Sequence, residues 1–237
     1  MPLAWNISSG GTATFSRHRS RKGEAVSLNQ DEQKTGSAIM GVILAGGLSR
    51  RMGGGDKGLS LLGGRTILER IAARLRPQVR ALFLNANGDA ARFETLSLPI
   101  LPDGVPDFPG PLAGVLAGLD HAAQAGFDEV AVVPCDAPFL PADLVARLRA
   151  GTQAGRGAVA VSAGRRHPTA SLWPVDLRTT LRKALVEEDQ RRVETILRQH
   201  DFAEVAWVAE PFDPFVNVND PDGMAEAEAL LARFPTA

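Results

Sequence analysis

The sequence has few of the features that indicate disulfide bonds, a membrane-spanning helix or binding to a polyanionic surface. Only one of its 237 residues is a cysteine, Cys135, which excludes an internal disulfide and a thiolate zinc cluster. No apolar run approaches the roughly 20 residues that a membrane-spanning helix needs. With 26 basic against 27 acidic residues, the chain also lacks a net field that would draw it onto nucleic acid or an anionic membrane. We therefore expect a cytoplasmic protein that binds neither.

The chain does have enough apolar material for a core, since 44% of its residues are hydrophobic. That material begins after residue 37. Residues 1–37 carry a basic cluster at 17–22 and few apolar residues, and no apolar stretch follows the charges as in a secretory signal. We expect residues 1–37 to be a disordered leader or an over-extended start, with a nucleic-acid or targeting arm as the alternative. Residues 38–237 are expected to form a single domain.

From Met40 onward, short apolar runs alternate with helical patterns, which is typical of an α/β fold. The runs are apolar enough to be buried on both faces, so we expect a mostly parallel sheet flanked by helices on both faces. Strands are predicted at 41–45, 80–85, 99–101, 129–133, 157–161, 169–173 and 203–208. Helices are predicted at 66–75, 112–125, 141–150, twice within 175–200, and at 221–234. The first helix begins with Thr66 and Glu69 at the spacing of a capping box.

A glycine-rich loop follows the first predicted strand and reads Leu44-Ala-Gly-Gly-Leu-Ser-Arg-Arg-Met-Gly-Gly-Gly-Asp-Lys57. Glycines allow backbone N–H groups to approach a ligand closely, and Arg50, Arg51 and Lys57 add positive charge. The pattern favours a polyphosphate-binding loop. It is not a Walker A motif, because no Gly-Lys-Ser/Thr closes it, and its spacing is not that of a Rossmann dinucleotide fingerprint. The alternative is a flexible strand-to-helix connection.

Two acidic residues follow later strands. Asp136 comes directly after an apolar run, where a carboxylate can hold Mg²⁺ while the metal bridges phosphate oxygens; the alternative is a helix cap. Asp103 lies in a segment rich in proline and glycine that leads into a helix, which suits a nucleobase-binding slot at the edge of a parallel sheet. The alternative for Asp103 is ordinary turn chemistry.

The remaining candidates are amides and arginines. Asn217 and Asn219 alternate, so they share a face if their segment is a strand, and neutral amides there suit metal or phosphate contacts; otherwise they are turn formers. The stretches Arg165-Arg-His-Pro-Thr169 and Gln190-Arg-Arg-Val193 suit an anionic ligand or an exposed basic surface. His121 and His200 show no metal-binding spacing.

The glycine-rich loop resembles the amino-terminal motif of the molybdenum cofactor guanylyltransferases. This family belongs to a nucleotidyltransferase superfamily that also makes nucleotide sugars and cytidylyl-erythritol. The resemblance extends from residue 40 to about 233 and includes Pro-Gly-Pro-Leu-Ala-Gly (109–114), Pro-Cys-Asp (134–136) and Asn-Val-Asn (217–219) in the family's order. The chain departs from the pattern by one additional glycine before Asp56. The resemblance implies a Rossmann-like nucleotidyltransferase fold, also called the nucleotide-diphospho-sugar transferase fold.

It also implies an activity, namely Mg²⁺-dependent transfer of GMP from GTP to molybdenum-molybdopterin, with release of pyrophosphate. The implied partners are GTP, molybdopterin, and molybdoenzymes or cofactor-insertion proteins. We expect Lys57, Arg51 and Asp136 to be catalytic, with Asp136 also the metal ligand. The expected GTP-binding residues are Leu44, Ala45, Gly46, Lys57, Asn85, Asp103, Gly110 and Asp136, and Asn217 and Asn219 are expected on the acceptor or metal side. The alternatives are a molybdopterin cytidylyltransferase, a sugar-phosphate nucleotidyltransferase, or a non-catalytic GTP-binding partner in molybdoenzyme assembly.

Overall fold

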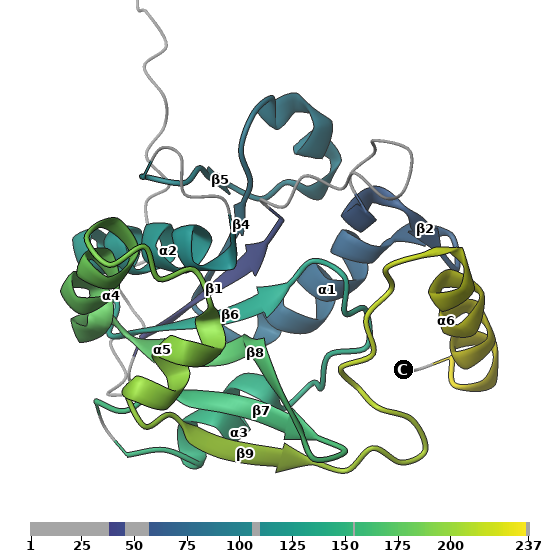
Figure 1. Ribbon diagram of the computed structural model, residues 1–237. Coiled ribbons are helices and arrows are strands. Elements are labelled where there is room, and N and C mark those ends of the chain that lie inside the picture. Colours follow the sequence, from purple (N-terminus) through teal and green to yellow (C-terminus); the bar gives the residue numbers. More distant parts are fainter. Residues whose placement is uncertain (1–37, 46–56, 106–109, 154, 236–237) are drawn as a thin grey trace, which may run out of the picture. The chain divides into compact units, whose positions relative to one another are not determined.

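A seven-stranded sheet with the order β5-β4-β1-β6-β8-β7-β9 organises the fold (Figure 1). The computed structural model describes residues 38–45, 57–105, 110–153 and 155–235. The strands of the sheet are β1 (Ile39–Leu44), β4 (Ala81–Asn85), β5 (Ile100–Leu101), β6 (Glu129–Pro134), β7 (Ala158–Ser162), β8 (Arg165–Pro174) and β9 (Ala203–Trp207). The helices are α1 (Ile67–Leu75), α2 (Pro111–Ala125), α3 (Leu144–Ala150), α4 (Arg178–Val186), α5 (Val193–Gln199) and α6 (Pro221–Arg233). Short 3-10 turns are η1 (Lys57–Leu59), η2 (Arg76–Gln78), η3 (Ala90–Leu96) and η4 (Val175–Leu177).

The sheet has a parallel half and a mixed half. Strands β5, β4, β1 and β6 are parallel neighbours. Along the chain they follow in the order β1, β4, β5 and β6, and the connections between them contain α1, η3 and α2, as parallel strands require. Strand β8 runs antiparallel to both β6 and β7, and β9 is parallel to β7. The predicted α/β class with a mostly parallel sheet is therefore confirmed, and β8 is the antiparallel exception.

Helices cover both faces of the sheet because apolar side chains alternate along its central strands. In β1, Met40 and Val42 pack with α2, α4 and α5, whereas Ile43 packs with α1 and α3. The same alternation holds in β6, where Val132 belongs to the apolar cluster of the first group of helices and Val133 to that of the second. Successive residues of a strand point to opposite faces, so two separate apolar cores result.

Local sequence signals account for the segment around α1. Thr66 accepts a hydrogen bond from the Glu69 N–H and the Glu69 carboxylate accepts one from the Thr66 N–H, so the predicted capping box is confirmed. Just before it, a two-stranded hairpin joins β2 (Leu61–Leu62) to β3 (Arg65–Thr66). The sequence analysis missed this hairpin. Its turn residues Gly63 and Gly64 have φ of 55° and 76°, and adjacent glycines are a typical signal of such a turn.

The helix predicted at 141–150 begins only at Leu144, and this correction has a physical cause. Side chains from the end of α1 and from η2 occupy the backbone groups that an earlier helical turn would use. Arg74 Nη1 donates to the Leu140 carbonyl at 2.8 Å, and Gln78 Nε2 donates to the Pro141 carbonyl at 3.0 Å. The Val145 N–H donates to Gln78 Oε1 at 2.9 Å, so α3 is capped by a residue more than sixty positions away.

The prediction for residues 1–37 lies outside the described residues, and the single domain at 38–237 remains a prediction. In the part of the chain that the structure describes, none of the helices is both long and apolar enough to span a membrane.

Gly114 allows helix α2 to lie directly against the ends of β1 and β4. A Cβ at this position would come 2.1 Å from Asn85 Oδ1 and 2.7 Å from Leu44 Cδ2. Asn85 cannot move away without losing the hydrogen bonds that its amide donates to the Leu101 carbonyl and to Asp103. The close helix–strand contact therefore depends on the absence of a side chain at Gly114.

We predict that Gly114→Ala destabilises the fold by about 1–3 kcal/mol, because the added methyl overpacks a buried contact. Alanine normally stabilises a helix relative to glycine, so a loss here would run against helix propensity. Denaturant unfolding measures the change. The control is Gly104→Ala, where a Cβ would meet no atom within 4 Å. Equal stability of Gly114→Ala and the unsubstituted protein would contradict the close contact.

Candidate active site

The predicted nucleotide-binding residues follow strands that end at the same level. Leu44 in β1 pairs with Asn85 in β4 and with Pro134 in β6, and Asn85 pairs with Leu101 in β5. All four strands are parallel, so their carboxyl ends form one edge of the sheet. The loops that leave this edge contain Ala45, Asp103 and Asp136. An open α/β sheet binds its ligand at this edge.

Asp103 is held by two asparagines at this edge. Asn85, only 2% exposed, donates from Nδ2 to Asp103 Oδ1 at 2.8 Å. Asn87 Nδ2 donates to Asp103 Oδ2 at 2.7 Å, and the Asp103 N–H donates to Asn87 Oδ1 at 2.9 Å. Each carboxylate oxygen thus accepts one amide hydrogen bond, which leaves further lone pairs of Asp103 for a ligand. Contact of Asn85 and Asp103 with a nucleotide remains a prediction.

Asn87 is a residue that the sequence analysis missed. The signal was present, because Asn85-Ala-Asn87 is an alternating pair of amides directly after a buried strand. The family resemblance included Asn85 but not Asn87. Only the fold brings Asn87 to Asp103, which lies sixteen positions along the chain.

Gly110 is the residue before the first turn of α2 and has φ of 139°, a conformation that favours glycine. Pro111 follows at the first helical position, where its missing N–H costs nothing. The amino terminus of α2 therefore begins beside the loop that carries Asp103, and free N–H groups at a helix start favour an anion. Contact of Gly110 with a nucleotide remains a prediction.

Asp136 carries a polar atom without a partner. Its Oδ1 is buried and has no hydrogen bond among the described residues. Burial raises the pKa of Asp136 above its usual value of 3.8, while the positive charge of Lys57 opposes that rise. A buried carboxylate oxygen is costly unless a cation or a donor satisfies it, so this residue is either strained or completed by a ligand. It does not cap α3, whose preceding residue is Asp143.

The Asp136 carboxylate fits Mg²⁺, which prefers oxygen ligands and is often held by one or two carboxylates together with phosphate oxygens and water. A site made by protein alone does not fit. Among the described residues, no group of three or more His, Cys, Asp or Glu side chains is placed to hold a metal ion. The geometry therefore suits a metal shared between Asp136 and a bound triphosphate.

Lys57 and Asp136 lie near each other, as expected of two residues that were both predicted to be catalytic. Lys57 Nζ donates to Asn219 Oδ1 at 2.9 Å, and the N–H of the neighbouring Val218 donates to the Asp136 carbonyl at 2.8 Å. The charge of Lys57 is close enough to limit the rise that burial causes in the pKa of Asp136. The structure thus brings together the end of the glycine-rich loop, the end of β6 and the segment that precedes α6. That last segment forms no strand, so the shared strand face of Asn217 and Asn219 is not observed.

A cavity of about 90 Å³ lies beside this group and is lined by Pro134, Arg165, His167, Phe215 and Asn217, among others. The ring of His167 stacks on Phe215 at 4.6 Å between centroids. Arg165 lines the same cavity, and its positive charge acts to lower the pKa of His167. The cavity therefore presents a cation, an amide and an imidazole next to the end of β6.

A buried chain of hydrogen bonds holds His167. The Ser162 hydroxyl donates to Asp213 Oδ1 at 2.7 Å, and His167 Nε2 lies 2.7 Å from the same hydroxyl. Ser162 has one proton to give, so Nε2 must be the donor to Ser162, and Nδ1 of the neutral ring is left as an acceptor. Burial lowers the pKa of His167 below its usual 6.5, although the Asp213 carboxylate works against this. The sequence offered no signal for the contact with Asp213.

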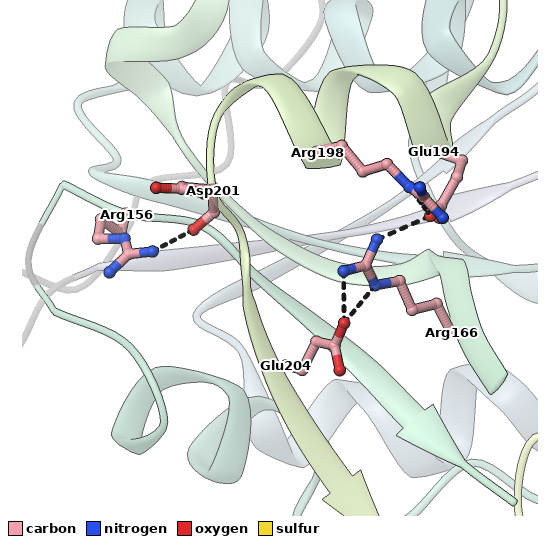
Figure 2. Close-up of polar contacts among 6 residues, drawn as sticks. All are labelled: Arg156, Arg166, Glu194, Arg198, Asp201 and Glu204. Atoms are coloured by element: carbon pink, nitrogen blue, oxygen red, sulfur yellow. Dashed lines mark hydrogen bonds and ion pairs between the residues drawn. The ribbon is translucent and has the colours of Figure 1, made fainter. Parts of the chain in front are cut away.

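The two arginines before His167 have different roles. Arg166 donates from Nη1 to Glu194 at 2.8 Å and from Nε to Glu204 at 2.6 Å, as Figure 2 shows. Arg198 also reaches Glu194. These contacts join α5 and β9 to β8, so Arg166 is part of the scaffold, whereas Arg165 remains beside the cavity. In the second predicted basic stretch, Arg191 pairs with Asp189 at 2.7 Å.

Two predicted site residues, Gly46 and Arg51, lie outside the described residues, as does the rest of the glycine-rich loop up to Asp56. Leu44 and Ala45 mark where that loop leaves β1. The Ala45 N–H donates to the Asn85 carbonyl at 2.8 Å, which extends the strand pairing by one residue. The described part of the site is thus suited to hold a polyphosphate between a lysine and a carboxylate, with a second polar cavity adjoining it.

Comparison with known proteins gives a consistent result. The family model for the MobA-like NTP transferase domain matches residues 41–205. A molybdenum cofactor guanylyltransferase from Nitrobacter hamburgensis is 51% identical over 196 residues, which cover 81% of this chain and 94% of the relative. One from Bradyrhizobium sp. is 50% identical over 202 residues, covering 84% of this chain and 95% of the relative.

Solved structures show the same fold at lower identity. Molybdopterin-guanine dinucleotide biosynthesis protein A from Archaeoglobus fulgidus has a TM-score of 0.64 and 22% identity, covering 82% of this chain and 100% of that one. The 4-diphosphocytidyl-2C-methyl-D-erythritol synthase from Anaerococcus prevotii has a TM-score of 0.65 and 13% identity, covering 83% of this chain and 97% of that one. These similarities confirm the predicted nucleotidyltransferase fold.

We predict that Asp136→Asn stabilises the metal-free fold, because it removes a buried carboxylate charge. The raised pKa means that the folded protein holds the Asp136 proton more tightly than the unfolded chain does. The penalty from Asp136 therefore grows as the pH rises above 3.8 through the folded pKa, and it shrinks as the pH falls. At neutral pH we expect a gain of roughly 1–3 kcal/mol, seen as a rise in Tm in the presence of a chelator.

With GTP present, Mg²⁺ at millimolar concentration should raise the Tm of the unsubstituted protein above its value with GTP alone, and it should leave the Tm of Asp136→Asn unchanged. Asp143→Asn, at the start of α3, is the matched control and should keep the response to Mg²⁺. The same Mg²⁺ response in Asp136→Asn and in the unsubstituted protein would exclude Asp136 as a metal ligand.

Proposed function

Because the chain belongs to the molybdenum cofactor guanylyltransferases, a group of MobA-like NTP transferase domains, we propose that it transfers GMP from GTP to molybdenum-molybdopterin and releases pyrophosphate. The observation that carries the proposal is Asp136 Oδ1, which is buried beside Lys57 at the carboxyl edge of the sheet and has no hydrogen-bond partner among the described residues. A cation and a metal-binding carboxylate at one point are what a triphosphate requires. In the same proposal the protein acts in the cytoplasm.

The reaction needs no nucleophile from the protein. A phosphate oxygen of the acceptor attacks the α-phosphorus of GTP in line, and the bond from that phosphorus to the bridging oxygen of the β-phosphate breaks. The electron pair leaves with pyrophosphate. The acceptor phosphate is already ionised near neutral pH, so the protein has to hold two anions together and offset the charge that develops.

Each described residue then has a definite task. Lys57 offsets negative charge on the phosphates and on the departing pyrophosphate. Asp136 would hold Mg²⁺, which when bound neutralises charge on phosphate oxygens. Asp103, held by Asn85 and Asn87, orients the nucleoside. The proposed GTP-binding set is Leu44, Ala45, Gly46, Lys57, Asn85, Asp103, Gly110 and Asp136, with Arg51 assisting Lys57.

The acceptor is assigned to the cavity beside β6. Arg165 supplies a positive charge for an anionic group, His167 offers Nδ1 as an acceptor, and Asn217 offers an amide. The cavity adjoins the end of the strand that leads to Asp136, so an acceptor there would meet the α-phosphate of a nucleotide at the sheet edge. Molybdoenzymes or cofactor-insertion proteins would receive the product.

The proposed function is tested by incubating the protein with Mg²⁺, molybdenum-molybdopterin and each of the four nucleoside triphosphates separately. We expect the dinucleotide product and pyrophosphate to form with GTP, at a rate at least tenfold above that with CTP, ATP or UTP. Faster reaction with CTP would identify a cytidylyltransferase, and reaction only with a sugar phosphate would identify a different acceptor class. GTP binding without release of pyrophosphate would show a non-catalytic GTP-binding protein.

We predict that Lys57→Ala lowers kcat/KM for GTP by roughly 10²–10³-fold, the size of effect seen when one charge-stabilising group is removed from an active site. The fold should be unaffected, because Lys57 is only partly buried and lies in a 3-10 turn at the edge of a loop. Lys183→Ala, an exposed lysine on α4, is the control for loss of a positive charge and should keep full activity. Full activity of Lys57→Ala would remove Lys57 from the mechanism.

A further inference from the structure

The amide of Asn219 is the described contact that orients the Lys57 ammonium. Lys57 Nζ donates to Asn219 Oδ1 at 2.9 Å across 162 positions of sequence. A lysine side chain has four rotatable carbon–carbon bonds, and its charge is a point that can occupy many places around its Cα. A hydrogen bond to a fixed acceptor restricts it to one of them.

Both ends of this contact are anchored. On the lysine side, the Ser60 N–H donates to the Lys57 carbonyl at 3.0 Å, and Gly58 packs so closely on Leu68 that a Cβ would come within 2.6 Å of it. On the asparagine side, the preceding Val218 is 1% exposed and donates its N–H to the Asp136 carbonyl. The contact is therefore between two positions that the fold holds, although the side chains themselves are exposed.

The residue that follows Asn219 fixes the segment from the other direction. Asp220 caps α6, because its Oδ1 accepts a hydrogen bond from the Gly223 N–H at 2.8 Å. Asn219 thus lies between a buried valine tied to the end of β6 and the cap of a helix. Neither neighbour can shift without breaking a backbone hydrogen bond, so the backbone that carries the Asn219 side chain has little freedom.

A neutral amide suits this position better than a carboxylate would. A carboxylate would bind the ammonium more strongly, but its negative charge would offset that of Lys57 and would repel phosphates. The Asn219 carbonyl holds the lysine and leaves its charge available to a ligand. The electrostatic effect of Lys57 on the nearby Asp136 is consistent with a charge that remains effective in the site.

We propose that Asn219 is a positioning residue for Lys57, which it holds at the polyphosphate site before the nucleotide arrives. The inference rests on the proposed function and deepens it. It also separates the two asparagines, because Asn217 lines the cavity with His167 whereas Asn219 acts on the nucleotide side through Lys57. This role differs from the acceptor-side or metal-side role expected from the sequence.

A double-mutant cycle tests the proposal with four proteins: the unsubstituted chain, Asn219→Ala, Lys57→Ala and the double variant. The first measurement is the dissociation constant of Mg²⁺-GTP by titration calorimetry, and the second is kcat with KM for each substrate. We expect Asn219→Ala to weaken GTP binding or lower kcat about 5- to 20-fold in the unsubstituted background. In the Lys57→Ala background the same substitution should change either quantity less than twofold, because residues that act as one unit are not additive.

The KM for the acceptor should stay within twofold of the original value in Asn219→Ala. Gln199→Ala removes an exposed amide from α5, far from the site in sequence, and should change none of these quantities. Denaturant unfolding of each variant shows whether the fold is retained. A loss of stability that accounts for the change in GTP binding would overturn the positioning role.

Two other results would also overturn it. One is an Asn219→Ala effect of equal size with and without Lys57, which would mean that the two residues act independently. The other is a rise in the acceptor KM that persists in the Lys57→Ala background, which would place Asn219 on the acceptor. If the protein binds GTP but forms no product with molybdenum-molybdopterin, the proposed function fails while the GTP-binding cycle still decides the role of Asn219. If it does not bind GTP at all, both fail.

Discussion

The site depends on one constraint, which is that four neighbouring parallel strands end at paired residues. Leu44, Asn85, Leu101 and Pro134 are aligned by backbone hydrogen bonds, so whatever follows them in sequence is brought to one edge of the sheet. A shift of one residue in any pair would turn every apolar side chain of that strand to the wrong face. The two apolar cores, one on each face, therefore fix the register. The register in turn places the Asp103 and Asp136 loops at the same edge of the sheet, on either side of the end of β1.

Electrostatics then sets what the edge can hold. Asp136 Oδ1 is buried and lacks a hydrogen-bond partner among the described residues, and burial raises the pKa of this carboxyl because it disfavours the charged form. Such a group reduces stability and is retained where a ligand completes it. Lys57 offsets part of the penalty, but a single positive charge cannot both neutralise Asp136 and hold a triphosphate. In the proposed function, a divalent cation held by Asp136 would resolve this conflict.

The sequence predicted the parts of the molecule that depend on local pattern. Apolar runs located the strands to within a few residues, and Thr66 with Glu69 located the start of α1. What it could not predict depends on contacts between distant segments. The start of α3 is set by Gln78. The tautomer of the His167 ring is set by Ser162, whose hydroxyl proton is donated to Asp213. The position of Asp136 after a buried strand indicated a metal site, but only the fold shows that its Oδ1 has no protein partner among the described residues.

Neutral amides orient the ionised groups of this site, and the chemistry explains why. Asn85 and Asn87 each donate to one oxygen of Asp103, and Asn219 accepts from Lys57. A charged partner would hold these groups more tightly but would cancel the charge that the ligand needs, as the scaffold arginine Arg166 illustrates when it is surrounded by Glu194 and Glu204. That ion-pair network joins secondary structure elements and leaves no net positive charge for a ligand. A site that binds two polyanions therefore benefits when asparagine side chains orient its charged residues, because a neutral amide does not cancel their charge.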